Sequence, residues 1–174
     1  MRVGLVQVRP SEWERVLEQQ EADVVIHVLE GKVKTREEQQ LLVELAPVLI
    51  VPEKCPAKSA EYFLKKDRLD DALIALPSTE VMTRLFQEEL GRRRIAWPVR
   101  MEVDGLDIVE KYVTGGFGVG LSVAVSGRAL PAGLRMLPLE DFPLLTLVAS
   151  WKGELTPVQL SLIHISEPTR PERI

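Results

Sequence analysis

The sequence of 174 residues contains a single cysteine, Cys55, and only two histidines. One cysteine excludes an internal disulfide framework and makes a reducing compartment the simpler assignment. The chain also lacks an excess of positive charge, because 22 Lys+Arg residues stand against 26 Asp+Glu residues, for a formal net charge of −4. This balance keeps a protein soluble but supplies no basic surface for direct binding to nucleic acid.

Long hydrophobic runs are missing as well. The apolar runs at 46–51 and 142–150 are far shorter than the roughly 20 residues that a membrane-spanning helix needs. The apolar stretch behind Met1 is too short and too soon interrupted for a signal peptide. Otherwise the composition, 45% hydrophobic and 28% charged, is that of a globular protein. We therefore expect a cytoplasmic protein without membrane contact, built as one domain or two small lobes.

The hydrophobic pattern alternates between strand-like and helix-like segments. Apolar spacing of three and four residues predicts helices, whereas short apolar or alternating runs predict strands. This alternation predicts an α/β fold with mostly parallel sheet. A loop or a short helix is expected over 31–40, and a connection over 128–137. The predicted strands are 2–8, 22–28, 41–45, 46–51, 72–76, 99–103, 119–125 and 142–151, and the predicted helices are 11–20, 61–66, 81–90 and 106–113, with a last helix starting at 156–157.

Six residues from Gly115 to Gly120 contain four glycines and invite a nucleotide-binding interpretation. The dinucleotide fingerprint needs glycines at its first, third and sixth positions in a strand-to-helix turn. Here the glycines follow a predicted helix and precede a predicted strand, and the spacing fails. We expect a helix cap and close helix–strand packing instead. Gly91 is likewise expected to end the preceding helix in a left-handed cap.

Candidates for metal binding or covalent catalysis are scarce. His27 lies inside a buried-strand pattern, without further ligands at metal-binding spacing. Cys55 stands between Lys54 and Pro56 and lacks a Cys-x-x-Cys partner. We therefore predict no metal, no cofactor and no catalytic residue.

Two turns carry the best candidate binding residues. Ser78 and Thr79 follow a predicted buried strand and precede a helix, and Asp104 and Gly105 occupy the equivalent turn one unit later. Hydroxyls and free backbone N–H groups at a helix start can hold a carboxylate, phosphate or sulfate, although a simple N-cap is the open alternative. In open α/β sheets, ligands lie beyond the carboxyl ends of the strands. We expect the four residues to line one cleft.

The segment Val99–Val125, VRMEVDGLDIVEKYVTGGFGVGLSVAV, resembles the second lobe of the effector-binding domain of LysR-type transcriptional regulators. Further segments resemble the family in the same order: EADVVI at 21–26, PVLIVPEKCP at 47–56, and 137–151 followed by LTP at 155–157. The resemblance covers most of residues 2–159. The sequence departs from the family pattern at Ser122 and Ala124, where a proline is usual nearby, and at Cys55, where a histidine is common.

The resemblance implies a type-2 periplasmic-binding-protein-like fold, in which two α/β lobes are joined by two crossovers and hold a small molecule between them. Residues 2–52 with 145–159 would form the first lobe, and 57–140 the second. Ser78, Thr79, Asp104 and Gly105 would then face an effector, expected to be an anionic metabolite. The family resemblance also implies a homo-oligomer, with DNA bound through a winged helix-turn-helix domain that this sequence does not contain.

The two ends are expected to depart from this plan. Residues 160–174, which begin LSLIHISEPTR, resemble a translated sequencing adapter and are set aside as a non-native tail. The first lobe is expected to lack its first strand and helix. Two other functions stay open, a stand-alone solute-binding protein of a transporter and an enzyme built on the same fold.

Overall fold

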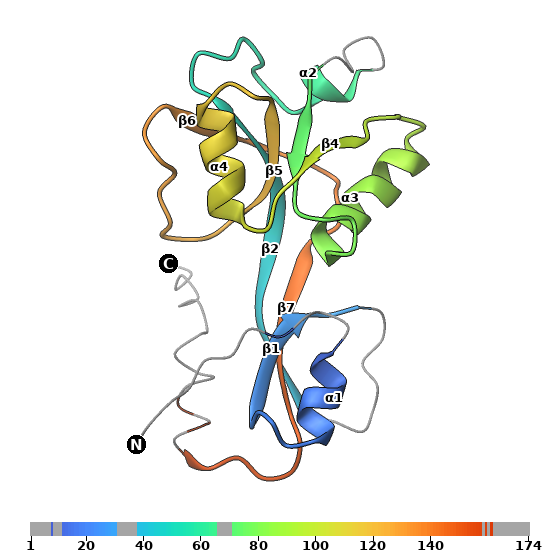
Figure 1. Ribbon diagram of the computed structural model, residues 1–174, viewed down its shortest axis with the longest axis vertical. Coiled ribbons are helices and arrows are strands. Elements are labelled where there is room, and N and C mark those ends of the chain that lie inside the picture. Colours follow the sequence, from blue (N-terminus) through green and yellow to red (C-terminus); the bar gives the residue numbers. More distant parts are fainter. Residues whose placement is uncertain are drawn as a thin grey trace, which may run out of the picture. The chain divides into compact units, whose positions relative to one another are not determined.

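The computed structural model describes residues 8, 12–30, 38–65, 71–157, 159 and 161. The chain divides into two compact units, of which unit 1 comprises 1–44 and 146–174 and unit 2 comprises 45–145. The chain therefore passes from unit 1 to unit 2 within one long strand and returns at a second one (Figure 1). The predicted strand 2–8 lies outside the described residues, apart from Val8. No helix in the described part of the chain is long and apolar enough to cross a membrane.

Unit 1 contains helix α1 (Trp13–Glu18) and strand β1 (Val24–Val28), with the strand order β1-β7-β2. The helix buries Val16 and Leu17 against Val25, as its i, i+3, i+4 pattern predicts. Strand β7 (Leu145–Trp151) pairs with β1 in antiparallel fashion. The prediction that β1 is a parallel strand is therefore wrong for its pairing with β7. Burial on both faces of β1 is wrong as well, because Ile26, on the face opposite Val25, is 55% exposed.

Unit 2 is built on a mixed sheet. Parallel pairing is confined to β4-β3-β5, whereas β2 pairs antiparallel with both β5 and β6, so the sheet is not mostly parallel as predicted. The physical reason is that β2 enters unit 2 without a βα unit, and no helical crossover fixes its direction. The strands, in the order β6-β2-β5-β3-β4, are β6 (Leu134–Pro138), β2 (Glu38–Pro52), β5 (Val119–Ala124), β3 (Leu73–Ala75) and β4 (Val99–Glu102).

Helices cover both faces of this sheet (Figure 1). On one face, α4 (Leu106–Thr114) packs Val109 and Val113 against Ile50 and Ile74. On the other, α3 (Val81–Arg92) belongs to an aromatic cluster in which neighbouring ring centroids lie 5.4 to 6.3 Å apart. The members of this cluster are Phe63, Phe86, Trp97 and Phe142. A short helix, α2 (Glu61–Leu64), contributes Phe63 and confirms the helical turn predicted there.

The glycines between α4 and β5 serve packing, as the sequence predicts. Gly116 has a φ of +77° after the end of α4, which is the left-handed conformation of a helix cap. A Cβ on Gly120 would lie 2.5 Å from Cγ1 of Val109, so this glycine allows α4 to approach the sheet closely. A Cβ on Gly118 would lie 2.1 Å from the carbonyl oxygen of Ala72. These three positions have structural roles.

Some boundaries differ from the predictions. Helix α3 continues through Gly91, and the left-handed residue after it is Arg94, with a φ of +59°. The segments 41–45 and 46–51 form one continuous strand, β2, which also takes in residues 38–40 from the predicted loop. Strand β6 lies where the sequence predicts only a connection.

Candidate functional site

The two predicted turns follow adjacent parallel strands of unit 2. Strand β3 leads into α3 through Ser78 and Thr79, and β4 leads into α4 through Asp104 and Gly105. Because β3 and β4 are parallel neighbours, their carboxyl ends lie at the same edge of the sheet. The backbone N–H of Val103 donates to the carbonyl oxygen of Ala75 at 3.0 Å, which extends the pairing up to the turns.

Ser78 and Thr79 are both exposed and lie just before the helix. The N-cap of α3 is Glu80, whose side chain makes no capping hydrogen bond. The two hydroxyls are therefore not N-caps, and neither has a hydrogen-bond partner within the described residues. The carbonyl oxygen of Glu80 accepts from the N–H of Arg84, so the amides of residues 81–83 have no acceptor within the helix.

The turn around Ser78 is held by its own helix. Thr83 is fully buried, and its hydroxyl donates to the carbonyl oxygen of Leu76 at 2.9 Å. The N–H of Glu80 donates to the carbonyl oxygen of Pro77 at 2.9 Å, which closes a tight turn around residues 78 and 79. These contacts fix the backbone and leave the two hydroxyls on the outside of the turn.

The second turn is similar in plan. Asp104 is exposed, and Gly105 is the N-cap of α4. Gly105 has no side chain to cap the helix, and the carboxylate of Asp107 folds back beside it: a Cβ on Gly105 would lie 2.7 Å from Oδ1 of Asp107. Asp107 also forms an exposed ion pair with Lys111 at 3.5 Å. An acidic side chain in the first turn complements the positive end of the helix dipole.

Glu102, which is not among the residues predicted from the sequence, joins the two turns. It is the last residue of β4, and its Oε1 accepts a hydrogen bond from the backbone N–H of Ser78 at 3.2 Å. The alternation of β4 places Glu102 and Arg100 on one face, and both are exposed. The sequence signal for an outward Glu102 was present in this alternation. The sequence held no signal that Glu102 would contact the turn at Ser78, because that contact depends on the order of the strands in the sheet.

His27 belongs to a different cluster, in unit 1. Its ring stacks on Trp13 with centroids 3.9 Å apart, and its Nε2 lies 2.9 Å from the hydroxyl of Ser150. The Nδ1 atom is 3.1 Å from the carbonyl oxygen of Val28, which can only accept, so Nδ1 carries the proton. Burial lowers the pKa of His27 below its ordinary value of 6.5. In the described residues, no group of three or more His, Cys, Asp or Glu side chains is placed to hold a metal ion.

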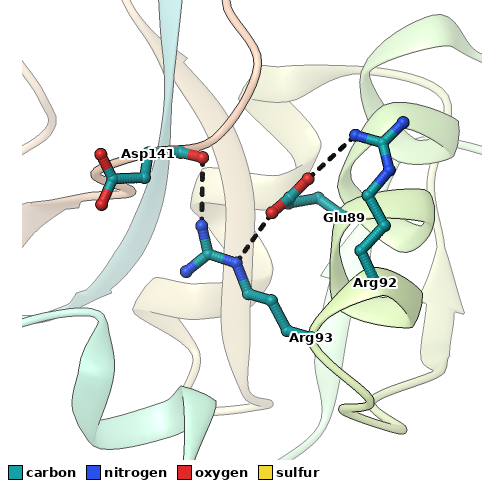
Figure 2. A network of polar contacts seen from close by, with 4 residues as sticks. All are labelled: Glu89, Arg92, Arg93 and Asp141. Atoms are coloured by element: carbon teal, nitrogen blue, oxygen red, sulfur yellow. Dashed lines mark hydrogen bonds and ion pairs between the residues drawn. The ribbon is translucent and has the colours of Figure 1, made fainter.

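Two further features of the structure do not involve the predicted residues. A hollow of about 350 Å³ in unit 1 is lined by Asp23, Lys152 and Glu154 among others. Gln159 also lines it, and its side-chain oxygen accepts a hydrogen bond from the backbone N–H of Thr156. In unit 2, the guanidinium of Arg93 donates to Glu89 and to the carbonyl oxygen of Asp141, as Figure 2 shows. Arg93 also lies 4.3 Å from the centroid of the Phe142 ring, so this network fastens the end of α3 to the loop before β7.

Comparison with known proteins decides the family. The family model of the LysR substrate binding domain matches residues 1–160. The chain belongs to this family. The LysR-type resemblance carried by Val99–Val125 and the type-2 periplasmic-binding-protein-like α/β fold are both confirmed, with mixed sheets.

Solved structures of LysR-type regulator domains are similar to this one. The cofactor-binding domain of the Cbl transcriptional regulator matches with a TM-score of 0.77 at 18% identity, covering 93% of this chain and 73% of that chain. The Synechocystis PCC6803 CcmR regulatory domain in complex with 2-PG has a TM-score of 0.71 at 16% identity, with 91% and 78% covered. The BenM effector binding domain with its effector benzoate has a TM-score of 0.71 at 14% identity, with 95% and 76% covered. A search of curated protein sequences found no match.

Proposed function

We propose that this chain is the ligand-sensing domain of a LysR-type transcription regulator, and that unit 2 contacts a small anionic effector through Ser78, Thr79, Asp104 and Gly105. Membership of the LysR substrate-binding family supports the sensing role. The observation that carries the proposed site is the hydrogen bond between the Ser78 amide and Glu102, which joins the two turns at one edge of the sheet.

The chemistry of the turns supports an anion as the ligand. Two exposed hydroxyls can donate to a ligand, and the amides of residues 81–83, at the positive end of the α3 dipole, have no acceptor one helical turn earlier within the helix. The relatives bound to benzoate and to 2-PG are similar in fold, and an effector of comparable size and charge would fit the same donor set.

The regulator role carries further proposals. The domain binds its effector without transforming it, in the cytoplasm, and assembles as a homo-oligomer. DNA is contacted through a winged helix-turn-helix domain separate from these residues. Effector binding acts by shifting the relative populations of domain and oligomer arrangements, because a ligand favours the arrangement that it binds more tightly.

Replacement of one hydroxyl tests the site. Thr79→Val keeps the shape of the exposed side chain but removes its donor, so we expect about a tenfold loss of affinity for the anion, with a melting temperature within about 1 °C of the wild type. The matched control is Thr114→Val on α4, because Thr114 is an exposed residue whose hydroxyl donates to the carbonyl oxygen of Glu110 in its own helix. Isothermal titration with benzoate, 2-PG and inorganic phosphate measures both variants. Equal affinity of Thr79→Val and the wild type would remove Thr79 from the site.

A further inference from the structure

The carboxylate of Glu102 occupies a further donor at the proposed site, the backbone amide of Ser78. Its Oε1 accepts from the N–H of Ser78 at 3.2 Å, just before the start of α3. Glu102 comes from the neighbouring strand and not from the helix itself, so the bond is a long-range contact across 24 positions of sequence. Both residues are exposed, so solvent and small solutes have access to this contact.

A side-chain carboxylate bonded to a backbone amide near a helix start is chemically the same arrangement as a bound carboxylate ligand. We propose that Glu102 is a specificity-determining residue of the effector site, and that its carboxylate holds the Ser78 amide until an anionic effector displaces it. This inference rests on the proposed function, because it assigns Glu102 a role at the same site.

The charges around this contact determine which anions can displace Glu102 from the Ser78 amide. Glu80 at the N-cap of α3 and the exposed Asp104 add negative charge to the two turns that Glu102 joins. A singly charged anion therefore meets repulsion unless Glu102 moves away. Arg100 lies two residues earlier on the same exposed face of β4 and is within reach of the displaced carboxylate. An effector thus outcompetes Glu102 only if it accepts enough hydrogen bonds from the other donors of the site.

The substitution Glu102→Gln tests this proposal, because it removes the negative charge of the side chain and keeps its size and its acceptor oxygen. The amide oxygen of glutamine still accepts from Ser78, but the negative charge is gone, so an anion displaces it more easily. We expect anions to bind the variant about tenfold more tightly than the wild type. The gain should shrink as salt is raised from about 0.05 to 0.5 M, since salt screens the repulsion that the substitution removes. A residue with a merely structural role would show no such salt dependence.

The control is Asp107→Asn, which removes one exposed carboxylate from the first turn of α4 without touching Ser78. The 174-residue protein, both variants and Thr79→Val are titrated with benzoate, 2-PG and inorganic phosphate by calorimetry. A gain of about tenfold for Glu102→Gln, with less than a twofold change for Asp107→Asn, is the expected result. Equal gains in both variants would show a general charge effect and overturn the proposal.

The remaining outcomes distinguish this inference from the proposed function. If Glu102→Gln weakens binding or leaves it unchanged while Thr79→Val loses binding, the role of Glu102 is refuted and the site stands. If Thr79→Val binds like the wild type, Thr79 leaves the proposed site, whatever Glu102→Gln does. Absence of binding by the wild type and by Glu102→Gln alike, for all three probes, also overturns the displacement role.

Discussion

Gly118→Ala is a substitution for which the structure predicts a large loss of stability. Gly118 has a φ of +155°, which side chains rarely adopt, and a Cβ there would lie 2.1 Å from the carbonyl oxygen of Ala72. The same oxygen accepts from the N–H of Val119 at 2.9 Å, so the methyl group would break the contact that starts the pairing of β5 with β3.

The magnitude follows from two costs. Backbone strain of this kind costs about 1–3 kcal/mol, and forcing an extra methyl into a packed position costs about 1–3 kcal/mol. We therefore expect Gly118→Ala to lower the free energy of unfolding by about 2–6 kcal/mol, a large part of the stability of an ordinary domain. Gly127→Ala is the control, because Gly127 also has a positive φ, +77°, but open space around its Cβ position, and it should lose only about 1–2 kcal/mol.

Urea unfolding followed by far-UV circular dichroism measures both variants. The slope of free energy against urea should stay the same for the two variants and the wild type, since the surface exposed on unfolding is unchanged. A difference of less than about 1 kcal/mol between Gly118→Ala and Gly127→Ala would refute the packing assigned to β5.

Two other predictions concern polar clusters. Arg93→Ala removes the cation–π contact with Phe142 and a hydrogen bond to a backbone carbonyl, for an expected loss of about 1–2 kcal/mol. The hydrogen bond from Arg93 holds the pKa of Glu89 below its ordinary value of 4.5. The wild type should therefore exceed Arg93→Ala in stability by the full amount above pH 4.5, and by less as the pH falls below that value. A stability difference that is unchanged at pH 3 would contradict this. Burial lowers the pKa of His27, so the neutral ring stabilises the fold above pH 6.5 and that stability is lost on acidification. His27→Phe, which keeps a ring against Trp13, should lose less stability than the wild type between pH 7 and pH 5 in thermal melts, and equal losses would rule out His27 as the cause.

The local hydrophobic pattern correctly predicted those helices and strands of unit 2 whose formation depends mainly on their own sequence. Helices α3 and α4 follow from apolar spacing, and β4 follows from alternation. Strand β6 was missed because its signal is its pairing with β2 across more than 80 positions of sequence. The cap at Gly91 was wrong because the bond from the N–H of Ile95 to the carbonyl oxygen of Leu90 ends the helix later, with Arg94 in the left-handed conformation.

The direction of pairing was the least predictable property of the fold. Apolar, β-branched runs such as 46–51 read as buried strands in either direction, because burial on both faces gives the same pattern. Strand β2 passes from unit 1 into unit 2 within the strand itself, and no helix lies between β6 and β7. The antiparallel pairing of both strands depends on which neighbours the completed sheet offers.

The candidate site was partly accessible from the sequence. Strand–turn–helix succession predicted that Ser78, Thr79, Asp104 and Gly105 follow strands, and the structure places both turns after adjacent parallel strands. Glu102 could not be placed, because its contact with Ser78 requires β3 and β4 to be neighbours. Hydroxyls that look like N-caps in sequence proved to precede the true N-cap, Glu80, by one and two residues.

The central claim is that an anionic effector binds unit 2 at the turns after β3 and β4. An NMR titration of the ¹⁵N-labelled protein with benzoate and 2-PG tests it most directly, since each backbone amide reports separately. We predict saturable shifts for the amides of Ser78, Thr79 and Gly105, with little change at Gly127. Saturable shifts confined to unit 1, with those three amides unmoved, would contradict the account.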